Sequence, residues 1–196
     1  MHHYTARKHT PKVKHGRVQR KNRTLKHVLI DHEEVARIGN LPVLSGRAIK
    51  HHRHVVSVDD LERFIGLIPN WNTLSQGLQG IVLGNGAKYC YGWYNEGLLA
   101  INAWSRAIVE VWYRAFFDDH RVILDRLMIP YEFDDARPGD VIVHFTPKTA
   151  GAFLLTHVFL HELGHHTDRM GSRRQAHLSR GEDYAEHFAL DMADMI

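Results

Sequence analysis

The sequence has only one cysteine, Cys90, among its 196 residues, which excludes a disulfide within the chain. A lone cysteine is typical of proteins in a reducing compartment. No uninterrupted apolar stretch approaches the ~18 residues that a membrane span requires, and the first residues lack the apolar segment of a secretion signal. These absences predict a cytoplasmic protein that does not enter a membrane.

Acidic residues are missing from residues 1–30, which carry nine lysines and arginines. The whole chain has 25 basic and 22 acidic residues, so the remainder holds 16 basic and 22 acidic side chains. A basic tail on an acidic body is a common arrangement for contacting nucleic acid or another polyanion, although a solubilising leader is the simpler interpretation. Residues 1–27 also show no helical or strand period. We predict a basic, disordered tail at 1–27 and a single domain at 28–196.

The pattern of apolar residues and turn signals predicts an α+β domain. Ser57 followed by Asp60 is typical of a helix N-cap, and Pro147 suits the first turn of a helix. In chain order, the expected elements are a short helix or packed arm at 28–44, a helix at 57–68, a short helical turn at 71–79, an antiparallel meander of strands at 81–83, 89–94 and 98–104, a long helix at 105–127, a hairpin at 128–133 and 141–145, and helices at 146–170 and 181–196.

The strongest motif is H-E-x-x-H, formed by His161, Glu162 and His165. Two histidines four residues apart lie on the same face of a helix, so both imidazoles can reach one cation. Zinc is the usual occupant, and the glutamate then lies within reach of a metal-activated water. The apolar residues at 153–160 should bury this helix, which would hold the ligands stiffly. The motif predicts Zn²⁺ as cofactor and Glu162 as general base.

The motif alone is weak, because 17 of the 196 residues are histidine and random placement gives H-E-x-x-H in about 7 of 100 such chains. A catalytic zinc also needs a third protein ligand and one open position. Glu182 and Glu186 lie on one face of the last expected helix. We predict that Glu182 binds the metal and that Glu186 orients a ligand histidine through its other ring nitrogen. Alternatives are the reverse assignment, or Asp168 or His177 as third ligand.

The segment His161-Glu162-Leu163-Gly164-His165 with Asp168, followed by EDYAEHFA at 182–189, resembles the gluzincin zinc peptidases, in particular the anthrax lethal factor catalytic domain and its relatives. The resemblance covers residues 153–194. It implies a zincin-like fold, in which a small antiparallel or mixed sheet packs on an active-site helix and a second helix carries a metal ligand. It also implies that His161, His165 and Glu182 bind zinc, that Glu162 is the general base, and that Glu186 and Asp168 are supporting residues.

One feature of that family is missing. Its members place a tyrosine shortly before the ligand glutamate to stabilise the oxyanion, and no tyrosine lies between His165 and Glu182. The side chains that could replace it are Arg180, His177, Tyr184, His187 and, from a strand, Tyr94.

Two neighbouring histidines have less direct interpretations. His157 lies one turn before His161 and is either a further ligand or, as we favour, a packed histidine bonded to the backbone. His166 points about 100° away from His165 and should not share the metal.

These features predict a zinc-dependent metallopeptidase that acts on a peptide or protein. Substrate could add as a strand to a sheet edge, for which the strand at 99–104 is a candidate. The competing hypothesis is a non-catalytic zinc module that binds nucleic acid or another polyanion through residues 1–30. Glu162 favours the enzyme, because a purely structural metal site does not need it, and such sites usually prefer cysteine ligands.

Overall fold

The computed structural model describes residues 13–14, 17–18, 32–86, 90–175 and 180–196. The chain divides into two compact units, Met1–Asp31 and His32–Ile196. In the first unit, β1 (Val13–Lys14) and β2 (Arg17–Val18) pair antiparallel. The rest of the tail predicted to be disordered lies outside the described residues.

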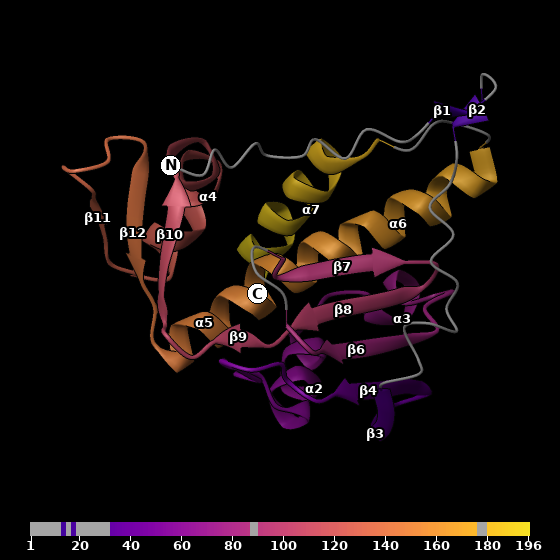
Figure 1. The fold of residues 1–196 in the computed structure, drawn as a ribbon. Helices are drawn as coiled ribbons and strands as arrows, with labels where there is room; N and C mark the ends of the chain where they lie inside the picture. The colour runs from indigo at the N-terminus through magenta and orange to yellow at the C-terminus, as the bar shows by residue number, and fades with distance from the viewer. Residues whose placement is uncertain (1–12, 15–16, 19–31, 87–89, 176–179) are drawn as a thin grey trace. The chain divides into compact units, whose positions relative to one another are not determined.

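A mixed five-stranded sheet in the order β3-β4-β6-β8-β7 forms the centre of the second unit (Figure 1). The strands are β3 (His32–Ile38), β4 (Leu41–Gly46), β6 (Gly80–Gly84), β7 (Gly92–Asn95) and β8 (Leu98–Asn102). The expectation of a short helix or arm over 28–44 was wrong, because β3 and β4 form an antiparallel hairpin. A short apolar run does not by itself distinguish a strand from a helix, and Gly39, with φ of +57°, supplies the turn.

The predicted antiparallel meander was also wrong in its order. β6 and β8 lie side by side and run parallel, while β7 pairs antiparallel with β8. Every residue of β6 and β8 is buried, whereas those of β7 are only half-buried. The two apolar strands therefore occupy the middle of the sheet, and the intervening strand lies at its edge.

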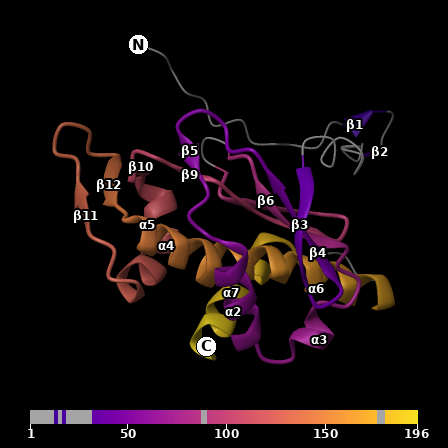
Figure 2. The same ribbon diagram turned by 90° about the horizontal axis from the view of Figure 1, so that it is seen from below.

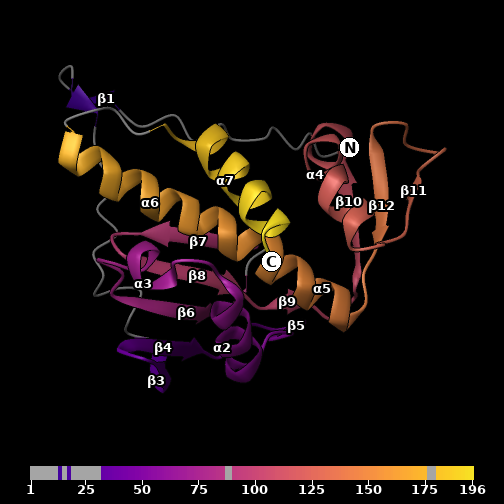
Figure 3. The ribbon, with the colours of Figure 1, turned by 180° about the vertical axis from the view of Figure 1, so that it is seen from behind.

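The helices α2 (Val58–Leu67), α3 (Trp71–Leu74) and α6 (Leu160–Gln175) lie on the same face of this sheet (Figures 2 and 3). The predicted N-cap of α2 is confirmed: the Ser57 side chain accepts from the Asp60 backbone N–H, and the Asp60 carboxylate accepts from the Ser57 backbone N–H. Phe64 of α2 meets Phe159 edge-on, with ring centroids 5.9 Å apart. Apolar and aromatic contacts of this kind join the helices to the core.

A second, three-stranded antiparallel sheet has the order β10-β12-β11. Its strands are β10 (Val109–Tyr113), β11 (Tyr131–Phe133) and β12 (Asp140–His144). The hairpin predicted at 128–133 and 141–145 is confirmed. The long helix predicted at 105–127 was wrong in its first half, where β9 (Trp104–Ser105) pairs with β5 (His52–Arg53) and β10 follows. Only α4 (Arg114–Arg126) is helical. β-branched and aromatic residues in 109–113 favour a strand.

The second unit is thus an α+β structure, as predicted at that level. None of the helices in the described part of the chain is long and apolar enough to cross a membrane.

Candidate metal centre

The H-E-x-x-H motif lies on a helical segment that begins at Pro147, as predicted. A capping box between Thr146 and Thr149 starts α5 (Pro147–Phe153), which continues through the π-helix η1 (Leu154–Phe159) into α6. The segment ends at Gln175, later than the predicted Gly171. Phe153, Phe159 and Leu160 are fully buried, so the core fixes the orientation of the motif.

The three predicted metal ligands meet at one point. His161 Nε2 lies 3.1 Å from His165 Nε2 and 3.2 Å from Glu182 Oε2, and His165 Nε2 lies 3.4 Å from the same oxygen. Tetrahedral ligands at the usual zinc distances of about 2.0–2.1 Å are roughly 3.3–3.4 Å apart. The donor triangle of the chain therefore has the size that a zinc ion requires, and the two histidines and the glutamate fit that ion.

Glu186 lies behind the first of these histidines. Its Oε2 is 3.2 Å from His161 Nδ1, while His161 Nε2 faces Glu182. A carboxylate bonded to the far ring nitrogen fixes the ring orientation and raises its basicity as a ligand. This is the geometry that the assignment of Glu182 as ligand and Glu186 as its support requires.

Asp168 supports the site from a different direction. It is 1% exposed, and its Oδ2 accepts from the backbone N–H of Arg180 at 2.7 Å and of Gly181 at 3.2 Å. The Arg180 side chain donates to Oδ1 at 3.0 Å. Since α7 (Glu182–Asp194) begins at the next residue, Asp168 fixes the point at which the helix with Glu182 begins.

The two helices that carry the ligands approach very closely, as Figures 1 and 3 show for α6 and α7. A Cβ at Gly164, between the two motif histidines, would lie only 2.8 Å from Ala185 Cα and 3.3 Å from Ala185 Cβ. Ala185 lies between Glu182 and Glu186. These two small residues allow the glutamates to reach the histidines.

Glu162 lies in a buried position between the motif helix and the sheet. It is 9% exposed, and burial raises its pKa to about 7 against the opposing charges of His161 and His165. A Cβ at Gly92 on β7 would come within 3.2 Å of Glu162 Cγ and 2.5 Å of a methyl of Val158. A carboxyl group whose pKa is about 7, placed beside a sheet edge, is well matched to general-base catalysis.

The charges of the site already favour a cation. Burial opposes protonation of His161, but its hydrogen bonds to Glu182 and Glu186 outweigh this and raise its pKa to about 9. Hydrogen bonds with His161 and His165 in turn lower the pKa of Glu182. A metal ion that binds these donor atoms would displace the proton from His161.

Four of the five candidates for oxyanion stabilisation belong to the described residues, and each makes contacts of its own. Tyr94 is engaged elsewhere, because its hydroxyl bonds to Nδ1 of the buried His166 at 3.0 Å and to the Gly97 N–H at 3.1 Å. The Arg180 guanidinium lies 3.5 Å from the centre of the Tyr184 ring. Of the two histidine candidates, His187 bonds to Asp183 O at 2.6 Å, and His177 lies outside the described residues.

His166 faces away from the metal ligands, as predicted. Its Nε2 donates to Gln76 O at 3.0 Å, so Nδ1 accepts from Tyr94. It joins α6 to the loop after α3.

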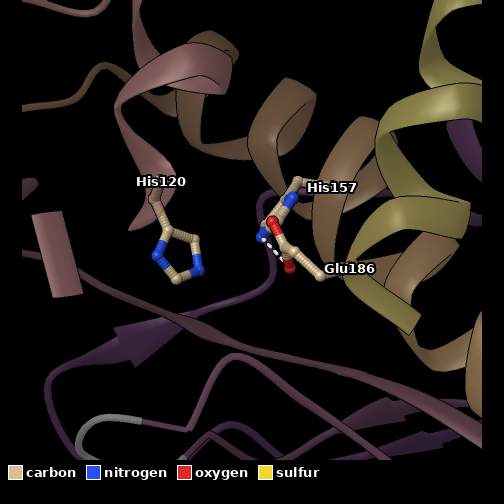
Figure 4. Close-up of side chains that lie close together, drawn as sticks. All are labelled: His120, His157 and Glu186. Atoms are coloured by element: carbon tan, nitrogen blue, oxygen red, sulfur yellow. Dashed lines mark ion pairs between the residues drawn. The ribbon is translucent and has the colours of Figure 1, made fainter. Parts of the chain in front are cut away.

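A second cluster was not predicted. His157 was expected to bond to the backbone, but its Nδ1 is buried and has no partner in the described part of the chain, and Glu186 lies 3.8 Å from its Nε2. His120, which had no recognisable sequence pattern, lies beside both on α4 (Figure 4). Spacing rules cannot associate His120 with His157, because the two belong to different helices.

No protein-family model, curated protein or solved structure matches this chain.

Proposed function

We propose that this chain is a zinc-dependent metallopeptidase with a zincin-like arrangement of sheet, motif helix and ligand helix. The observation that carries the proposal is the triangle of donor atoms on His161, His165 and Glu182, with sides of 3.1, 3.2 and 3.4 Å. Two neutral imidazoles, one carboxylate and an open fourth position are a common donor set of catalytic zinc. Zinc held there would acidify water and polarise a peptide carbonyl.

The residues around the triangle have distinct roles. Glu162 takes the proton of the attacking water and delivers it to the departing amine. Glu186 holds the His161 ring, and Asp168 fixes the start of α7. The Glu182 side chain is 82% exposed, so a substrate can approach the site from solvent.

Substrate binding is better assigned to β7 than to the strand at 99–104. The latter was a wrong candidate, since β8 is paired on both sides, with β6 and β7. Within the described residues β7 pairs with β8 alone. Its Gly92 lies against Glu162, so an extended peptide added to this edge would pass the general base.

The test is Glu162→Gln, which keeps the size of the side chain and removes the base. Both proteins are loaded with zinc and assayed on an internally quenched peptide library, with bound metal counted by mass spectrometry. We expect unchanged zinc and a loss of turnover of roughly 10²–10⁴-fold or more. Glu132→Gln, an exposed glutamate on β11, is the matched control and should cleave as the wild type does.

Two results would contradict the proposal. One is full activity of the Glu162→Gln protein. The other is a zinc-loaded wild-type chain that leaves the entire library intact.

A second candidate function, binding of a polyanion, is favoured by a separate observation. A cavity of about 680 Å³ is lined, among the residues that the structure describes, by residues 47–54 and Arg106. Its lining includes three arginines, a lysine and three histidines, and no acid. This basic lining suits phosphate groups, and the nine lysines and arginines in the sequence of residues 1–30 are a separate source of positive charge.

The measurement for this function is the anisotropy of a labelled random DNA duplex between 50 and 200 mM salt. Binding through phosphates weakens steeply with salt, and deleting residues 1–30 or replacing Arg47 and Arg106 by alanine should reduce that slope. Arg63→Ala, on the exposed side of α2, is the control. Equal binding by all four proteins, or none, would contradict this function.

A further inference from the structure

Three side chains outside the donor triangle converge behind it. His120 extends from α4, His157 from η1 and Glu186 from α7, and one donor atom of each lies within 4.8 Å of the others (Figure 4). The three elements are far apart in the sequence. The fold alone therefore brings two imidazoles and a carboxylate together.

The His120 ring is oriented as a metal ligand would be. Its Nδ1 lies 2.7 Å from Phe116 O, a distance at which the neutral ring must donate from Nδ1. Nε2 then carries the free lone pair. A ligand histidine is usually fixed in this way, with one ring nitrogen donating to a carbonyl and the other available to the metal.

The other two side chains have buried polar atoms that lack partners. His157 is 3% exposed, and among the described residues its Nδ1 has no hydrogen-bond partner; the same holds for the buried Glu186 Oε1. The distance of 3.8 Å between His157 Nε2 and Glu186 Oε2 is too long for a hydrogen bond. Each such orphaned group costs about 1–3 kcal/mol, and an ion between the three side chains would give Glu186 Oε1 a partner.

We propose that His120, His157 and Glu186 form a second binding site for a divalent transition-metal ion, Zn²⁺ being the occupant that this donor set fits. Two imidazoles and one carboxylate match zinc, copper, nickel or iron better than calcium or magnesium, which prefer oxygen ligands. A cluster that only packs in the core would instead satisfy its buried donors and acceptors with hydrogen bonds among its own side chains.

Glu186 connects this second site to the proposed catalytic one. The same carboxylate lies 3.2 Å from His161 Nδ1, so a cation on Glu186 would hold it in place behind the first ligand. Only this connection rests on the proposed function; the existence of the second site does not.

The test counts bound metal in the full chain. Protein stripped with a chelator is dialysed against Zn²⁺, and the bound zinc is counted by mass spectrometry. A second sample is dialysed against Co²⁺, and its absorption spectrum is recorded. We expect two equivalents in the wild type, one in His120→Gln and one in His165→Gln. His144→Gln is the matched control, because this exposed histidine pairs with Glu132 on the second sheet, and it should keep both equivalents.

The outcomes separate the two sites. One equivalent in the wild type that disappears in His165→Gln and persists in His120→Gln would overturn the second site and leave the first intact. One equivalent that persists in His165→Gln supports the second site even if the first fails. Circular dichroism checks the fold, and where His120→Gln does not fold, His157→Gln replaces it. Unchanged stoichiometry of two in a folded His120→Gln chain would also overturn the assignment.

Discussion

The contact between Gly164 and Ala185 makes a sharp prediction about how the ligand helices are held. A methyl group at Gly164 would lie 2.8 Å from Ala185 Cα and 3.1 Å from Ala185 O. Carbon atoms prefer separations of about 3.5–4.0 Å, so Gly164→Ala must push α7 from α6 by roughly 1 Å. Metal–ligand distances tolerate only about 0.2 Å. The shift therefore moves Glu182 and Glu186 away from the histidines.

We expect Gly164→Ala to weaken zinc binding by about 10–100-fold, the range seen when supporting groups of a metal site are disturbed. Overpacking costs about 1–3 kcal/mol of unfolding free energy, which the higher helix propensity of alanine offsets by about 1 kcal/mol. The matched control is Gly171→Ala on the same helix, where an added Cβ meets nothing within 4 Å. It should stabilise the chain by up to about 1 kcal/mol and bind zinc normally.

Zinc affinity is measured by competition with a chromogenic chelator, and stability by urea unfolding in the presence of EDTA. The comparison between the two alanine variants removes the effect of helix propensity. Equal zinc affinities and equal unfolding free energies in the two proteins would refute the idea that this close approach positions the ligands.

Four other substitutions probe the site. Glu186→Gln should weaken zinc at the first site by about 10–100-fold, whereas Glu182→Gln should lose it more completely; titration with a chelator separates the two, and the opposite order would reverse their roles. Asp168→Asn should lower the unfolding free energy by roughly 1.5–3 kcal/mol, seen in urea, because two backbone N–H groups lose a charged acceptor; no change would mean that α7 begins without its help. Gly92→Ala should reduce peptide turnover while retaining zinc, because a Cβ would lie 2.8 Å from Ala100 O and 3.2 Å from Glu162 Cγ; unchanged turnover would remove β7 from the substrate site.

Interactions within one helix, and the single hairpin of β11 and β12, were parts of this structure that the sequence could predict. The separation of His161 from His165, and of Glu182 from Glu186, specifies a shared helix face, and the structure brings the two faces together. The capping boxes at Ser57 and Thr146 are equally local.

Pairing between strands depends on more than local pattern. The predicted meander pairs consecutive strands, which are often neighbours. In the structure β6 and β8 are buried and lie together, and β7 lies at the edge. That edge position, rather than any side chain, is what makes β7 the better substrate strand. Sequence pattern alone could not assign it, because edge and centre are properties of the whole sheet.

The second histidine cluster was beyond prediction for a related reason. His157 shares a helix face with His161. His120 reaches the cluster from α4, whose start had been wrongly predicted at residue 105. No spacing relation exists between side chains on separate helices.

The motifs also contain a signal that ligand spacing overlooks. Gly164 lies between the two motif histidines, Ala185 lies between the two glutamates, and the structure places these small residues against each other. Larger side chains at either position would separate the helices by more than a metal–ligand bond can tolerate. The site therefore needs two features on each helix: ligands spaced to share one face, and a small residue between them that lets the helices approach closely.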